Sequence, residues 1–137
     1  MGADEPHRGR LIDHIHLVVA DIEVSRRFYA AILDALEVPI AGHGPDHFWA
    51  DELFVSSPLS EHAQGQLTGR HHIGFQAKHR EAVIRFHERG LRSGGRDNGA
   101  PSYRPYHPGY FAAFLLDPDG NNIEAVYHDK AGSAPTE

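Results

Sequence analysis

Apolar and polar residues recur in the same order in two parts of the chain. The segment HIHLVVADIEVSRRFY, residues 14–29, aligns without a gap over HIGFQAKHREAVIRFH, residues 72–87. The alignment pairs two histidines, two isoleucines and two phenylalanines: His14 with His72, Ile15 with Ile73, and Phe28 with Phe86. In each copy a β-branched run predicts a strand, and apolar residues at helical spacing then predict a helix. We interpret the two segments as an internal repeat.

Strand-like pieces follow each predicted helix. Expected strands cover residues 11–19, 38–42 and 47–57 in the first half, and 71–77, 91–95, 109–117 and 121–128 in the second. Asp21 is the expected N-cap of the first helix, and Gly90 the expected end of the second. The tight turn DPDG, residues 117–120, joins the last two strands as a hairpin, and residues 96–110 form a long loop. The pattern predicts two βαβββ modules in an α+β fold.

These elements divide one compact domain into segments. We expect a flexible N-terminus at 1–10, a first module at 11–56, a polar linker at 57–69, a second module at 70–128 and a disordered tail at 129–137. A chain of 137 residues with 40% apolar residues is large enough for one core.

Composition narrows the function classes. The net charge of −6 and the lack of a basic run argue against a nucleic-acid partner. The absence of cysteine excludes disulfides, cysteine-based zinc sites and thiol nucleophiles. No apolar run approaches ~18 residues, so no membrane span is expected. The start MGADEPHRGR lacks an apolar signal core, and a cytoplasmic location is expected.

Twelve histidines are the first chemical signal, because histidine is the commonest metal ligand. Side chains alternate along a strand, so His14 lies opposite the apolar face formed by Ile15, Leu17 and Val19. The same alternation places His72 and Glu124 on the polar faces of their strands. Two histidines and one carboxylate, with open positions for substrate, are typical of non-haem Fe(II) oxygenases, and Mn(II), Zn(II), Co(II) or Ni(II) can use the same set. The alternative is that the histidines are satisfied core residues and Glu124 faces water.

The motifs DHIHLVVADIEVSRRFY, HHIGF and FLLDPDGNNIEAV resemble the vicinal oxygen chelate superfamily, which includes glyoxalases, bleomycin-resistance proteins and extradiol dioxygenases. The resemblance covers about residues 11–128. It implies curled mixed sheets around a metal-binding cleft, with His14, His72 and Glu124 as metal ligands. Glyoxalases have a fourth ligand on the last strand of the first module; the turn match places Trp49 there, and a shifted register places Glu52 there. We favour the match to Trp49, and this departure from the family pattern argues against a glyoxalase I assignment.

Further residues are candidates for binding and catalysis. His16 shares a face with His14 and, like His107, is a candidate acid or base. Residues 96–110 are interpreted as a lid over the cleft. The candidate substrate-binding residues are Trp49, Tyr103, Arg104, Tyr106 and Tyr110.

These features together predict a metal-dependent enzyme, of dioxygenase-like or lyase/transferase type. Its small substrate would be chelated through vicinal oxygens, and the cofactor is expected to be Fe(II), Mn(II), Zn(II) or Ni(II). The alternative is a metal-free protein that binds a small molecule or drug, as bleomycin-resistance proteins do. By resemblance to small members of the superfamily, a homodimer is expected.

Overall fold

The structure is a computed structural model, and it describes residues 11–61 and 63–130. The predictions of a flexible N-terminus and of most of the disordered tail lie outside the described residues. The first half of the chain contains β1 (Ile15–Val18), α1 (Ile22–Ala35), β2 (Gly42–Gly44), β3 (His47–Ala50) and β4 (Leu53–Ser56). The second half contains β5 (His72–Gln76), α2 (Arg80–Arg92), β6 (Arg96–Tyr103), β7 (Tyr110–Leu116) and β8 (Asn122–His128). The two predicted βαβββ modules are confirmed.

Each module forms a four-stranded mixed sheet, and the two sheets have the same topology. The strand orders are β1-β4-β3-β2 and β5-β8-β7-β6. The first strand of each module pairs in parallel with the last, and the other pairings are antiparallel. The sheets do not close into a barrel, so each has a face that the helices leave open.

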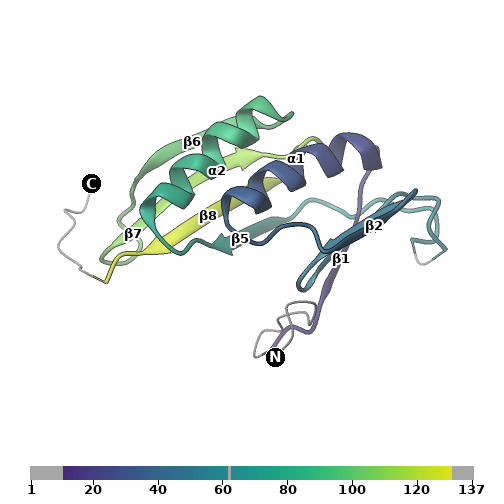
Figure 1. The fold of residues 1–137 in the computed structure, drawn as a ribbon, viewed down its shortest axis with the longest axis horizontal. Coiled ribbons are helices and arrows are strands. Elements are labelled where there is room, and N and C mark those ends of the chain that lie inside the picture. Colours follow the sequence, from purple (N-terminus) through teal and green to yellow (C-terminus); the bar gives the residue numbers. More distant parts are fainter. Residues whose placement is uncertain (1–10, 62, 131–137) are drawn as a thin grey trace.

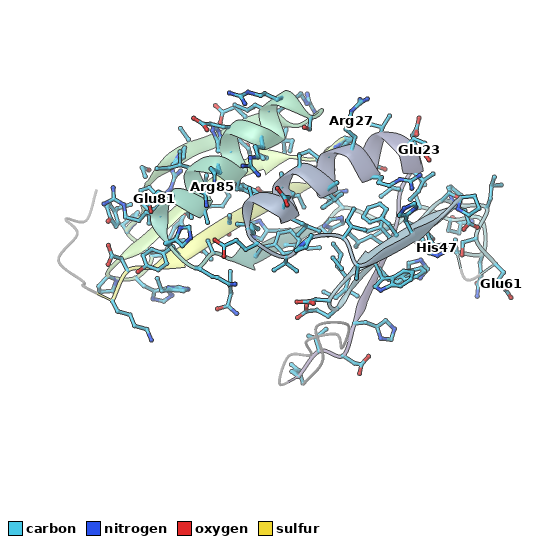
Figure 2. The ribbon with its side chains drawn as sticks, in the orientation of Figure 1. Glu23, Arg27, His47, Glu61, Glu81 and Arg85 are labelled. Carbon is cyan, nitrogen blue, oxygen red and sulfur yellow. The ribbon has the colours of Figure 1, made fainter. Side chains whose placement is uncertain are left out.

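The two helices pack side by side and bury their apolar faces. Figure 1 shows α1 and α2 next to each other, with the second sheet beneath α2 and the first sheet turned relative to it. The largest fully buried side chains come from both modules and include Phe28, Tyr29, Phe48 and Phe86. Burying each of the three phenylalanines contributes about 1.5–3 kcal/mol. The charged residues Glu23, Arg27, Glu81 and Arg85 project from the outer sides of the helices (Figure 2).

Both helices begin at a side-chain cap. The Asp21 carboxylate accepts hydrogen bonds from the N–H groups of Glu23 and Val24, as expected. In α2 the cap is His79, whose Nδ1 accepts from the Ala82 N–H. None of the described helices is long and apolar enough to cross a membrane.

The predicted end of α2 at Gly90 is wrong, because the helix continues to Arg92. Gly90 instead marks a close approach between three elements. A Cβ at this position would lie 2.2 Å from Leu115 in β7 and 3.0 Å from Ile32 in α1. The glycine therefore allows α1, α2 and the second sheet to meet. The expected strand at 91–95 is also wrong, since the helix occupies its first residues.

The strands of the first module differ from the prediction in two places. The expected strand at 38–42 is replaced by the short β2, which begins at Gly42. The expected single strand at 47–57 is two strands, joined by a turn at Asp51 and Glu52. Asp51 has a φ of +48°, a left-handed conformation that a short polar side chain tolerates.

The predicted loop at 96–110 is largely a strand. Residues Arg96–Tyr103 form β6, although this stretch contains Pro101 and Gly99. The strand lies at the edge of its sheet, where a missing N–H is tolerated. Its register shifts around Gly99, which has a φ of +149°. Only residues 104–109 remain as a connection, so the loop that could act as a lid is short.

The DPDG turn does more than close its hairpin, because it ties the second module to the first. Asp117 is buried, and its carboxylate accepts hydrogen bonds from the backbone N–H groups of Asp119 and Asn121. It also accepts a hydrogen bond from the Tyr29 hydroxyl of α1, at 2.7 Å. Asp119 in turn accepts from the Ala20 N–H, just before α1. Burial and the Asp117 charge raise the pKa of Tyr29 well above its usual value.

A second, exposed link joins the end of α1 to the start of α2. Glu37 lies 2.9 Å from His79 Nε2 and 3.6 Å from Lys78 Nζ. The hydrogen bond from His79 is the main reason that the pKa of Glu37 is lowered, and Lys78 contributes to the same effect. We call these residues, Glu37, Lys78 and His79, the helix clasp.

Replacing Tyr29 with Phe tests the buried link. The substitution keeps the ring but removes a hydrogen-bond donor from a buried carboxylate, so we expect a loss of about 1–3 kcal/mol in the free energy of unfolding. Denaturant titration measures this loss. Tyr103→Phe is the matched control, because Tyr103 donates to the less buried Asp129. An equal or smaller effect at Tyr29 would contradict the role assigned to the buried bond.

The helix clasp predicts a pH dependence. A folded-state pKa below the unfolded value of about 4.3 means that the clasp stabilises the fold above that pH. The contribution is lost as the pH falls through the lowered folded-state pKa. The melting temperature of Glu37→Gln should therefore lie below that of the wild type at pH 7, and the difference should vanish at low pH. A difference that persists unchanged into acid would show that the charge of Glu37 is not its cause.

Candidate metal centre and substrate-binding face

Glu124 is a buried carboxylate on the open face of the second sheet. Its neighbours Ile123 and Ala125 are fully buried in the core, and alternation along β8 directs Glu124 to the opposite side. Glu124 Oε1 lies 2.9 Å from His72 Nε2, and Oε2 accepts a hydrogen bond from the Tyr110 hydroxyl. Without such partners a buried carboxylate would cost several kcal/mol. The structure thus brings two of the three predicted metal ligands into contact.

Tyr110 is surrounded by three other rings. Its ring centroid lies 5.2 Å from Tyr106, 5.9 Å from His107 and 5.4 Å from His128. Burial raises the pKa of Tyr110, and the hydrogen bond to Glu124 and the charge of Glu124 raise it further. The phenol therefore stays protonated at neutral pH and can donate to the carboxylate. Three candidates from the sequence, Tyr106, His107 and Tyr110, gather at this end of the sheet.

Arg104 lies on the same open face beside Phe114. Its guanidinium carbon is 5.2 Å from the centre of the Phe114 ring, and its Nη2 donates to the carbonyl oxygens of Ala100 and Ala112. The Phe114 ring in turn lies 6.2 Å from that of His72. The Phe114 ring therefore lies near both the Arg104 cation and His72, the contact partner of Glu124.

Tyr103 occupies a different position from the other candidates. It packs 4.9 Å from the buried Phe111 ring, under the guanidinium of Arg80, and its hydroxyl donates to Asp129. Burial is the first cause of its raised pKa, followed by the bond to Asp129. The structure places Tyr103 on the helix-covered side of the sheet, apart from Glu124.

His14 lies on the first module, immediately before β1, and its side chain is 68% exposed. Its Nδ1 is 2.7 Å from Asp13 Oδ1, a contact that orients a histidine and leaves Nε2 for a metal. Within residues 11–61 and 63–130 of one chain, no three His, Asp or Glu side chains form a group that could hold a metal ion. One chain therefore does not bring His14 into a group with His72 and Glu124.

The strand register identifies the residue of the first module that corresponds to Glu124. Gly74 pairs with Glu124 in the second sheet, and His16 pairs with Phe54 at the same place in the first. Phe54, rather than the expected Trp49 or Glu52, holds the equivalent position. The sequence alone predicted one strand over residues 47–57 and missed the turn between β3 and β4. It therefore could not identify Phe54 as the residue that corresponds to Glu124. An apolar ring there supplies no fourth ligand.

The open face of the first sheet is aromatic. His16 Nε2 lies 2.8 Å from Ser56 Oγ, and its ring meets Phe54 edge-on at 5.0 Å. Trp49 stacks on His47 with a ring distance of 5.8 Å. Sequence reasoning found Trp49 and His16 but missed His47 and Phe54, which alternation along β3 and β4 places on this same face.

Residues of both modules line a groove of about 1280 Å³. Residues of both edge strands line it, including Ile15, Ile73 and Phe75. Leu11 and Trp49 also line it and are 89% and 38% exposed. Apolar surface of this kind in a groove typically marks a contact with a ligand or another chain.

Chemically, the second sheet offers an imidazole and a carboxylate in contact, with hydrogen-bond donors on one side. The first sheet offers another imidazole, oriented by a carboxylate. Imidazole and carboxylate ligands are suited to divalent first-row metals. The donor set therefore fits such an ion if His14 meets the His72–Glu124 pair.

Two βαβββ modules with unclosed mixed sheets and ligand-type residues on the open faces define a recognisable class of protein. The sequence profile of the Glyoxalase/Bleomycin resistance protein/Dioxygenase superfamily matches residues 11–125. The chain belongs to this superfamily. None of the curated proteins is similar enough to match the chain.

Solved structures share the fold. A glyoxalase/bleomycin resistance protein from Albidiferax ferrireducens is 27% identical with a TM-score of 0.72, covering 85% of this chain and 98% of that one. A glyoxalase-related enzyme from Fulvimarina pelagi is 19% identical with a TM-score of 0.65, covering 92% and 97%. A lactoylglutathione lyase from Agrobacterium tumefaciens is 17% identical with a TM-score of 0.60, covering 87% and 94%. The last two similarities concern the fold alone.

Replacing Tyr110 with Phe tests the contact that holds Glu124. The variant leaves a buried carboxylate oxygen without its donor, so we expect a loss of about 1–3 kcal/mol in the free energy of unfolding. A double-mutant cycle with Glu124→Gln should give a coupling of roughly 0.5–3 kcal/mol. Tyr106→Phe, at an exposed residue of the same cluster, should change stability by less than about 0.5 kcal/mol. Additive effects of Tyr110→Phe and Glu124→Gln would count against the contact.

Proposed function

We propose that the protein is a divalent-metal-dependent enzyme that acts on a small substrate chelated through vicinal oxygens. The observation that carries this proposal is the buried Glu124 carboxylate, held by Tyr110 and in contact with His72 on an open sheet face. A buried carboxylate paired with an imidazole that is 48% exposed suits a ligand pair facing an accessible site.

The metal would be held by His72 and Glu124 of one chain and His14 of a second chain. His14 lies immediately before β1, at the place that His72 occupies at the start of β5, and both strands are at the edge of their sheets. An edge strand can pair with another chain. A homodimer in which β1 of one chain approaches β5 of its partner would bring the three ligands together and cover part of the apolar groove.

When bound, the cation supplies a Lewis acid that stabilises negative charge developing on a substrate oxygen. The protein side chains have separate roles. Tyr110 donates to Glu124 and holds the carboxylate in place. His107, beside Tyr110, and His16, beside Ser56, are the candidates for moving a proton to or from the substrate. Arg104 provides positive charge on the same face for an oxygen-rich substrate.

A second candidate function is metal-free binding of a small molecule. The aromatic open face of the first sheet favours it, because stacked rings can hold a flat ligand without any metal. The two candidates differ in whether the purified protein contains stoichiometric metal.

Metal analysis of variants tests the composite site. Protein purified without chelator or metal-affinity tag should contain about one metal per chain, and His14→Ala, His72→Ala and Glu124→Ala should each lose most of it. His43→Ala is the control, because His43 is exposed and contacts Arg26 instead of the candidate ligands. Metal-free wild-type protein that cannot be reconstituted with Fe(II), Mn(II) or Ni(II) would favour the second candidate.

A mixed dimer tests whether the site is shared. Joining a His14→Ala chain to a His72→Ala chain leaves one composite site intact and destroys the other. We expect the purified mixed dimer to bind about one metal per two chains, whereas both parent dimers bind little. A mixed dimer as empty as its parents would place each site within a single chain and contradict the shared arrangement.

A further inference from the structure

Three rings on the open face of the first sheet share nearly one orientation. The His47 ring lies 5.8 Å from that of Trp49 and 5.5 Å from that of Phe54. The planes differ by only 9° and 13°. We call Trp49, His47 and Phe54 the ring array. Figure 2 shows His47 on the first sheet, away from α1.

Two glycines leave room for two rings of the array, those of Trp49 and His47. Gly42 and Gly44 of β2 face Trp49 and His47 in the strand register. A Cβ on Gly42 would lie 2.3 Å from the indole ring, and one on Gly44 would lie 2.5 Å from the imidazole ring. The two rings therefore lie directly against the backbone of β2, which is possible only because both positions lack a side chain.

The ring array is partly open to solvent and adjoins the candidate metal ligands. Trp49 is 38% exposed, and His47 and Phe54 are partly exposed. His16 touches Phe54 edge-on and lies on β1, two residues after His14. The rings thus form an accessible aromatic surface that reaches β1, the strand that His14 immediately precedes.

We propose that the ring array binds a planar aromatic ring of the substrate. Flat conjugated rings gain from offset stacking on parallel aromatic surfaces, which a saturated ring of similar size does not. The inference names the substrate class of the proposed site and in that respect rests on the proposed function. The binding of the ring itself requires only the first sheet.

Trp49 is the only tryptophan in the chain, so its indole N–H gives one assignable NMR signal. Titrating labelled protein with 2-naphthoate should shift this signal in a saturable way. Decahydronaphthalene-2-carboxylate, the saturated acid of equal charge, should bind roughly two- to tenfold more weakly. Equal affinity for the two acids, or no saturable shift, would overturn the proposal.

Variants locate the binding surface. Trp49→Leu removes the largest ring and Gly42→Ala displaces it, so calorimetry should show about tenfold weaker binding of 2-naphthoate in both. Leu91→Ala, at an exposed leucine of α2, should bind as the wild type does. Unchanged affinity in Trp49→Leu would contradict the inference even if Gly42→Ala fails to fold.

Metal content measured in the same samples separates this inference from the proposed function. Binding of 2-naphthoate to protein that takes up no metal would leave the aromatic site standing and remove the metal-dependent activity. Uptake of metal without preference for the planar acid would leave the metal-dependent activity standing and overturn the aromatic site.

Discussion

The arrangement of the two modules depends on the buried hydrogen bond between Tyr29 and Asp117. The bond joins the middle of α1 to the hairpin turn of the second module, 88 residues further along the chain. Asp117 also organises that turn through two backbone N–H groups. One carboxylate therefore sets both the local geometry of the β7–β8 hairpin and the position of the first module against it. Gly90 complements it by letting the helices and β7 approach closely.

This fixed packing explains why ligand-type residues appear as separate groups on one chain. With the helices packed together in the centre, each sheet keeps its own open face. The second sheet carries the paired His72 and Glu124, and the first carries His14 with its Asp13 contact. In the proposed site, the full set of metal ligands therefore comes together only when two chains assemble.

The sequence predicted the features that depend on local pattern and on the repeat. Alternation placed Glu124 opposite Ile123, and the structure agrees. The β6 strand was missed because Gly and Pro residues oppose strand formation unless the strand is at an edge, which is a tertiary property. The position of Phe54 was missed because apolar residues lie on both sides of the β3–β4 turn. The Tyr29–Asp117 bond joins residues too distant in sequence for any local signal.

Phe54 and Glu124 occupy matching positions in two copies of one module, yet one is an aromatic hydrocarbon and the other an acid. A pair of copies that shares one cation needs only one acid for it. The matching position in the other copy, which still supplies His14, is then released from coordination chemistry, and mutations at that position change which molecules fit while leaving cation affinity intact. In such a duplicated architecture, reactivity and selectivity would diversify on separate halves of the same polypeptide.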